Sequence, residues 1–197
     1  MSRRERKLIR RLKARDEEAF SELVRTHQHK VFNLVFRILG DRQEAEDVAQ
    51  EVFVAVFKYI EGFRGDAQLS TWLFRVATNT ARNRLKYLAR RSQRAHQPIE
   101  DTSERRFSTA SSPSRPSSPS EAAMGKELEQ ILQEGLNALP EIHRTIVVLR
   151  DVEHLSYDEI ADVVELPVGT VKSRLFRARA ALRAFVEERY EISSGAS

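Results

Sequence analysis

The chain has 197 residues, of which 41% are hydrophobic, so one or two small domains with modest cores are expected. It contains no cysteine, which excludes structural disulfides, thiolate zinc sites and thiol catalysis. The net charge is only +4, but the pI is about 9.6 and the charges are segregated along the chain. Residues 1–15 carry eight basic residues and one acid, 41–51 carry five acids and one Arg, and 172–183 carry five basic residues and no acid. Basic segments suit phosphate groups, and an acidic segment suits a basic protein surface.

Long segments of 3.6-residue apolar periodicity, with few alternating strand patterns, predict an all-α fold. No apolar run approaches the roughly 18 residues that a membrane span needs, and the basic N-terminus lacks the apolar core of a signal peptide. We therefore expect a cytoplasmic protein with no membrane insertion. The sequence contains no motif that pairs a nucleophile with a base and no Gly-rich phosphate loop, so we expect neither an enzyme nor a cofactor.

The segment 16–91 has dense apolar periodicity and predicts a first helical domain, after a basic N-terminal arm over 1–15. Within it, residues 41–60 predict an amphipathic helix whose polar side gathers carboxylates. That side contains Glu44, Asp47 and Glu51, with Gln50 nearby. Clustered carboxylates could hold a metal ion, but no His lies among them, and we expect no metal here. A docking face for a protein is the better interpretation, because this surface would repel DNA.

Residues 63–91 form a segment that carries no acid after Asp66. With Ser70 as N-cap, this segment predicts a helix over 71–90. At 100° per residue, one face of that helix carries Arg75, Asn79, Arg82 and Lys86. Trp72, at the edge of this face, can stack on an unpaired base, and Asn can hydrogen-bond base edges. The pattern favours a helix that reads and opens nucleic acid; the alternative is a solvated basic face with Trp72 in the apolar core.

Residues 92–123 contain SSPSRPSSPS and almost no large apolar residue. Prolines among serines can neither pack a core nor propagate a helix, so a flexible linker is predicted here. Apolar periodicity returns over 124–190 and predicts a second helical domain, followed by a tail over 191–197. A linker of this kind lets two small domains bind separated sites on one extended object; an incidental tether is equally compatible with its composition.

The second domain contains a helix-turn-helix pattern over 155–182. Ser156 and Glu159 form the capping box of a first helix, and Pro167 suits the first turn of a second. The polar face of the second helix carries Thr170, Ser173, Arg174 and Arg177, and Lys172 would flank the DNA backbone. Arg takes a guanine bidentately and Ser and Thr suit phosphates or bases, so a recognition helix for the major groove is predicted. The alternative is an amphipathic hairpin that packs on protein.

These segments together resemble a bacterial RNA polymerase sigma factor of the sigma-70 family, in its extracytoplasmic-function group. For the two parts of the family's region 2, the resemblance rests on DEEAFSELVRTHQHKVFNLVFRILGDRQEAEDVAQEVFVAVF and FRGDAQLSTWLFRVATNTARNRL. For region 4 it rests on LSYDEIADVVELPVGTVKSRLFRARAAL. It implies a region 2 helical bundle over 16–91 and a region 4 helix-turn-helix domain over 124–190.

The resemblance also implies a function: the chain would bind core RNA polymerase and direct it to specific promoters. The acidic helix would bind the clamp of the largest subunit, and region 4 would rest on the flap of the second-largest subunit. The residues implied for binding the polymerase are Asp47, Gln50 and Glu51. The residues implied for capturing and melting the minus-10 element are Asp66, Ala67, Gln68, Leu69, Trp72, Phe74, Arg75, Asn79, Arg82, Asn83 and Lys86. Those implied for reading the minus-35 element as duplex are Thr170, Lys172, Ser173, Arg174 and Arg177. The family further implies an anti-sigma factor that masks these surfaces until a signal arrives.

Two other functions remain open from the residues alone. A helix-turn-helix regulator that binds duplex DNA as a dimer would explain 155–182, but neither the Trp72 helix nor the acidic face. A metal-dependent nuclease would use the acidic cluster, with the basic helices as a track for its substrate. Tight operator binding without polymerase would favour the first, and metal-dependent cleavage abolished by Asp47→Ala would favour the second.

Overall fold

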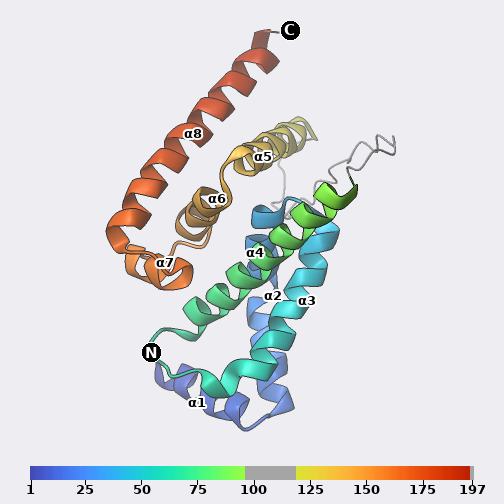
Figure 1. Cartoon of the computed structure of the whole chain (residues 1–197). Coiled ribbons are helices and arrows are strands. Elements are labelled where there is room, and N and C mark those ends of the chain that lie inside the picture. The colour runs from blue at the N-terminus through green and yellow to red at the C-terminus, as the bar shows by residue number, and fades with distance from the viewer. Residues whose placement is uncertain (96–118, 196–197) are drawn as a thin grey trace.

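The computed structural model describes residues 1–95 and 119–195, and every regular element in these ranges is helical (Figure 1). The predicted all-α fold is therefore confirmed. The predicted linker falls mostly on residues 96–118, which lie outside the described ranges. The α-helices are α1 (Arg3–Lys13), α2 (Glu17–Leu39), α3 (Arg42–Tyr59), α4 (Leu69–Ala95), α5 (Pro119–Ala138), α6 (Glu141–Val147), α7 (Tyr157–Val164) and α8 (Val168–Gly195). A 3₁₀ turn, η1 (Ile60–Gly62), follows α3, and a π-helical turn, η2 (Val148–Val152), follows α6.

The first group of helices is a bundle of α2, α3 and α4, with α1 packed across its lower end in Figure 1. Asp16 caps α2 by accepting a hydrogen bond from the backbone N–H of Ala19, and Gly40 ends α2 in the left-handed conformation at φ 76°. Asp41 then caps α3, so a short turn reverses the chain. The apolar faces meet in the bundle centre, where Leu34 and Val48 are fully buried.

The second group contains α5 to α8, and its short α7 and long α8 form the helix-turn-helix. Helix α8 packs against α5, α6 and α7, so three helices support the recognition helix. Ile146 and Ile160 are fully buried beneath it. None of the helices in the described ranges combines the length and the apolar character that crossing a membrane requires.

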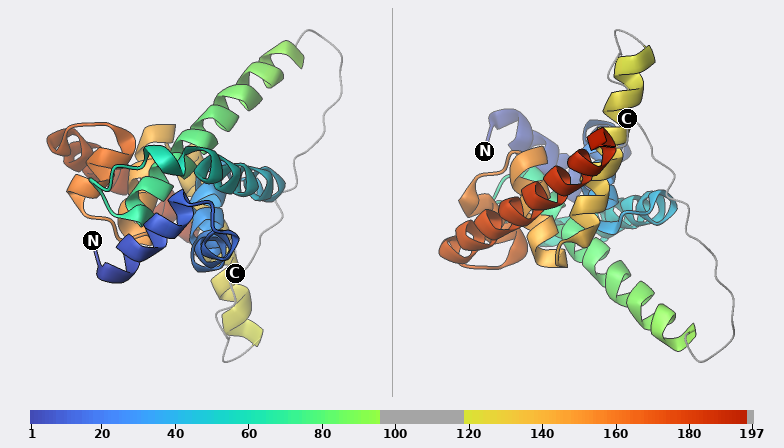
Figure 2. Two further views of the ribbon diagram at one scale, coloured as in Figure 1. Left: turned by 90° about the horizontal axis from the view of Figure 1, so that it is seen from below. Right: turned by 90° about the horizontal axis from the view of Figure 1, so that it is seen from above.

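The two groups pack against each other. Helix α7 lies beside the first half of α4, while α5 and α6 contact α2 (Figure 1). Arg144 joins the groups, because its Nη1 donates to the carbonyl of Ile38 at 2.5 Å and its Nη2 to the carbonyl of Asn137 at 2.8 Å. Figure 2 shows that the C-terminal half of α4 leaves this packed body and projects away from it.

Two helix starts differ from the sequence predictions. Helix α4 begins at Leu69, so Ser70 lies within its first turn and is not its N-cap. The backbone N–H of Leu69 donates instead to the Glu5 carboxylate at 2.7 Å, an acceptor that comes from α1. Helix α5 begins at Pro119, earlier than the predicted domain start at 124. Proline is favoured in the first turn of a helix because it has no N–H to satisfy there.

Candidate nucleic-acid interface

A short loop between η1 and α4 is anchored at both ends by buried apolar side chains. Phe63 and Leu69 are 4% and 3% exposed, and the Phe63 ring lies 5.3 Å from the Trp72 ring. Between them Gly65 has φ 83°, a left-handed conformation that glycine adopts without strain. Asp66 and Gln68 are exposed, and Ala67 is half-buried. The predicted minus-10 loop is therefore a firmly held turn that presents polar side chains to solvent.

This loop and the first turns of α4 enclose a cavity of about 390 Å³. Its lining includes Asp66 and Ala67 from the loop and Trp72 and Arg75 from α4. The second group contributes one carboxylate, Asp162 of α7. A cavity with an aromatic ring, a guanidinium and loop polar groups can hold a flipped base by stacking and hydrogen bonding.

Of the α4 residues predicted to bind DNA, some are exposed to solvent and others are buried. Asn79, Asn83 and Lys86 are exposed, and Arg75 is half-buried. Phe74 is only 4% exposed, so it supports the helix from within, as Leu69 supports the loop. Arg82 forms an ion pair with the second group of helices. Its Nε lies 2.5 Å from Oε1 of Glu141 on α6.

The acidic face of α3 is the second part of the site. Asp47, Gln50 and Glu51 are exposed and line a surface hollow of about 520 Å³. The same hollow includes Val54 and Tyr59, which are 53% and 66% exposed and which sequence reasoning did not single out. Carboxylates beside exposed apolar side chains suit a protein partner with a basic rim.

Arg84 of α4 holds this acidic face in place, a role that no pattern in the sequence indicates. Its Nη1 donates to Glu44 at 2.7 Å and its Nη2 to Glu51 at 2.6 Å. Burial opposes the charge of Arg84, but the two carboxylates outweigh it and raise the pKa of the guanidinium. Arg84 therefore joins the acidic face of α3, predicted to bind polymerase, to α4, predicted to bind DNA.

The helix-turn-helix prediction is confirmed in its local geometry. Ser156 and Glu159 form both hydrogen bonds of the capping box, and α7 ends at Glu165 in the left-handed conformation. Val171 and Leu175 are buried, which turns the opposite face of α8 outward. On that face Lys172, Ser173 and Arg177 are exposed and Thr170 is half-buried. Arg174 is half-buried and lines a crevice with Arg82 and Glu141.

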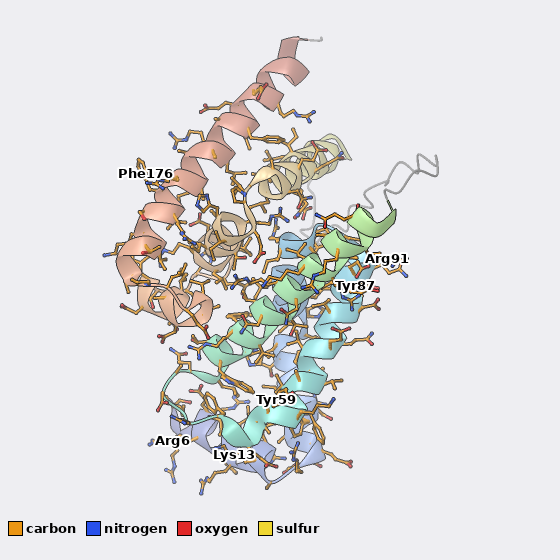
Figure 3. The ribbon with its side chains drawn as sticks, viewed as in Figure 1. Arg6, Lys13, Tyr59, Tyr87, Arg91 and Phe176 are labelled. Carbon is orange, nitrogen blue, oxygen red and sulfur yellow. The ribbon has the colours of Figure 1, made fainter. Side chains whose placement is uncertain are left out.

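Phe176 lies on this outward face of α8 and was missed by sequence reasoning. Its side chain is 77% exposed, more than any other large hydrophobic residue among those the structure describes. In Figure 3 it points away from the body of the molecule. A signal existed, because Phe176 lies one helical turn after Lys172 and Ser173, on the same face of the helix. An apolar side chain in such a row is suited to the methyl group of thymine.

No cluster of three or more His, Asp or Glu side chains suited to a metal ion occurs within the described ranges. Of the histidines, His27 is half-buried, and its Nδ1 finds no hydrogen-bond partner in the described part of the chain. Burial, with Lys30 nearby, lowers the pKa of His27.

The all-helical fold and its helix-turn-helix define the class to which this chain belongs, the helical DNA-binding proteins. Two family models match the chain, Sigma-70 region 2 over residues 23–101 and Sigma-70 region 4 over residues 129–182. The RNA polymerase sigma-H factor of Pseudomonas aeruginosa is 41% identical over 175 residues, covering 89% of this chain and 90% of that protein. The ECF RNA polymerase sigma-E factor of Escherichia coli K12 is 39% identical over 176 residues, covering 89% of this chain and 90% of that protein. The chain belongs to the sigma-70 family of RNA polymerase sigma factors, in its extracytoplasmic-function group.

Solved structures share this fold. The sigma factor RpoE of Bartonella quintana, in complex with the anti-sigma factor NepR, matches with a TM-score of 0.68 and 21% identity. That match covers 85% of this chain and 96% of the other. CnrH, in complex with the cytosolic domain of CnrY, matches with a TM-score of 0.65 and 24% identity, covering 93% of this chain and 97% of the other.

Proposed function

We propose that this chain binds core RNA polymerase in the cytoplasm and directs it to a specific set of promoters. The observation that carries the proposal is the separation of three surfaces on one small molecule. The acidic hollow on α3, the loop cavity beside α4 and the outward face of α8 each differ in chemistry. Family membership supports the same function.

In this proposal the domain over 16–91 binds the polymerase and melts DNA. The α3 hollow, with Asp47, Gln50 and Glu51, docks on the clamp of the largest subunit. The loop cavity captures a base that flips out of the minus-10 element, and Trp72 and Arg75 hold it by stacking and charge. Unstacking costs a few kcal/mol per base step, which the captured base offsets. Asn79 and Asn83, exposed on α4, contact the melted strand beyond the cavity.

The domain over 124–190 reads duplex DNA. Helix α8 enters the major groove of the minus-35 element with Ser173, Arg174 and Arg177 toward the bases and Lys172 toward a phosphate. The same domain rests on the flap of the second-largest subunit. Core polymerase holds the two domains at the promoter spacing, so two weak contacts act as one strong contact through effective concentration.

An anti-sigma factor is a further partner in this proposal. The sigma factor of one similar structure was solved in complex with the anti-sigma factor NepR, and this chain shares its fold. The exposed apolar residues beside the acidic face, Val54 and Tyr59, offer a surface for a second protein as well as for the clamp.

Run-off transcription tests the proposed function. Core RNA polymerase, with and without this protein, transcribes a pooled library of genomic promoters. New, discrete start sites with a shared upstream spacing are expected. Activity indistinguishable from core polymerase alone, from a folded protein, would contradict the proposal and favour a regulator that binds duplex DNA by itself.

A further inference from the structure

Helix α1 carries a row of cations that form no ion pair or hydrogen bond with any residue in the described ranges. The row consists of Arg3, Arg6, Lys7 and Arg10, and all four side chains are exposed. At 100° per residue these positions fall within an arc of about 100°. Leu12 is fully buried on the opposite side of the helix. Figure 3 shows Arg6 of this row pointing away from the protein body.

The other four cations of residues 1–15 have partners. Arg4 pairs with Glu22, Arg11 with Asp16 and Arg15 with Glu61, and Lys13 donates to the carbonyl of Phe63. The segment therefore uses half of its positive charge to fix its own position. Within the described residues, the charge of the α1 cation row is left without a partner.

The row is held beside the candidate minus-10 loop. Glu5, on the same helix, accepts from the backbone N–H of Leu69 at 2.7 Å, and Lys13 donates to the carbonyl of Phe63 at 2.6 Å. Met1 lies close to the middle of the loop, since its Cε is 3.5 Å from the position that a Cβ on Gly65 would take. Both ends and the middle of the loop thus touch α1 or the residues next to it.

The chemistry of the row fits nucleic acid better than protein. Four cations with no aromatic or aliphatic side chain among them lack the apolar anchors that dominate protein interfaces. Arg and Lys without carboxylate partners are suited to phosphate oxygens. The row also extends the candidate DNA-binding surface. Along α4 the residues of this surface run from Lys86 to Trp72. The loop follows them, and α1 lies next to the loop.

We propose that the α1 cation row binds the phosphodiester backbone of promoter DNA where the DNA leaves the loop cavity on the side away from α4. The proposal rests on the proposed function, because it requires the cavity to hold the minus-10 element. The row adds affinity and salt dependence without reading sequence. The phosphates that the row binds could belong to an unpaired strand or to reformed duplex. The experiment distinguishes these two cases.

The test uses holoenzyme assembled from core RNA polymerase and the full chain. The variant is Arg6→Gln with Arg10→Gln, and the matched control is Arg25→Gln with Lys30→Gln, two exposed cations of α2 that remove the same charge. Three probes carry a mapped promoter. One ends at the downstream edge of the minus-10 element, one continues as unpaired strand, and one continues as duplex. Affinity is measured as a function of salt concentration for each.

The Gln variant should differ from wild type only on the two probes that continue past the minus-10 element. The slope of log affinity against log salt should decrease in magnitude by about 1.4 on the unpaired extension, or by about 1.8 on the duplex extension, for two lost phosphate contacts. The short probe and the control variant should behave as wild type, and Arg6→Lys with Arg10→Lys should restore the slope. Unchanged slopes on both extended probes would overturn the proposal, as would loss of core polymerase binding by the Gln variant. Failure of the wild-type chain in run-off transcription would instead remove the proposed function.

Discussion

Arg82 and Glu141 form an ion pair between the two helical groups, with Arg82 Nε 2.5 Å from Glu141 Oε1. Arg82 belongs to the candidate melting surface, so in this arrangement a carboxylate occupies the place that the proposed function gives to a DNA phosphate or base. Two further carboxylates of the second group take similar positions. Glu159 accepts from the hydroxyl of Thr71 at 3.1 Å, and Asp162 lines the loop cavity. We infer that the packed arrangement and promoter binding exclude each other.

Glu141→Gln should therefore help the free protein to bind single-stranded DNA. Partly exposed ion pairs contribute about 0.2–1 kcal/mol, so affinity for an oligonucleotide with the minus-10 sequence should rise by at most about fivefold. Fluorescence anisotropy on the free protein measures this. Glu134→Gln is the control, because Glu134 pairs with Arg189 within the second group. Equal affinities for both variants and the wild type would show that the ion pair does not restrain the domains.

The recognition helix predicts two different responses to loss of a cation. Arg174→Ala should weaken minus-35 binding by about 1–3 kcal/mol and relax the base preference at one position, as for a lost bidentate contact. Lys172→Ala should weaken binding to all sequences alike and reduce the salt slope by about 1. Binding to a library of randomised minus-35 duplexes separates the two. A uniform loss from Arg174→Ala would assign that side chain to the backbone instead of the bases.

Phe176 should recognise the 5-methyl group of thymine. Phe176→Ala should lower affinity for the minus-35 duplex several-fold, while the thermal midpoint stays close to wild type because the ring is 77% exposed. Replacing thymine by deoxyuridine in the probe removes the methyl group alone. The wild type should lose affinity on that probe and the variant should not. If the wild type binds both probes equally, Phe176 has another partner.

Substitutions on the candidate polymerase surface and on the candidate DNA surface of region 2 should impair different steps. Asp47→Ala should lower affinity for core polymerase and its salt dependence, because an exposed charge at an interface mainly steers association. Asn79→Ala should leave core binding unchanged but reduce open complex formation by about tenfold, for one lost base contact. Native gel titration and permanganate reactivity of melted thymines measure the two effects. Loss of core binding in Asn79→Ala would mean that the surfaces overlap.

His27 should make the fold sensitive to mild acid. Burial, and secondarily Lys30, lowers the pKa of His27 below its usual 6.5, with Glu5 acting in the opposite direction. The folded state therefore favours the neutral ring, so the free energy of unfolding should fall as pH drops below about 6.5. His27→Gln should show a smaller loss between pH 7.5 and 5.5 than His29→Gln, an exposed control on the same helix. Identical losses would assign the acid sensitivity to other groups.

Local patterns in the sequence predicted the helices well. The capping box of Ser156 and Glu159 and the apolar row of Val48, Val52 and Val56 depend only on neighbours along the chain, and the structure has them as expected. The start of α4 was predicted wrongly because the acceptor for its first N–H, Glu5, lies far away in sequence. Propensity and periodicity cannot show a partner supplied by tertiary contact.

For the candidate site too, the sequence predicted local features but not contacts between distant segments. Helical spacing placed Asn79 and Ser173 on outward faces, as found. It could not show that Arg82 pairs with Glu141, since that contact depends on how two separate helical groups pack. The role of Arg84 was missed because it depends on how two helices of the first group pack. Its two carboxylate partners, Glu44 and Glu51, belong to another helix.

The contact of Met1 with the loop has a practical consequence for handling the protein. Since Met1 Cε lies 3.5 Å from the Cβ position of Gly65, an affinity tag fused before Met1 would start beside the candidate minus-10 loop. Its residues could crowd the loop and could disturb the Glu5 contact that begins α4. The C-terminal end of α8 lies at the opposite end of the molecule in Figure 1. Purification handles and fluorophores belong there, and a labelled N-terminus would instead report on occupancy of the loop.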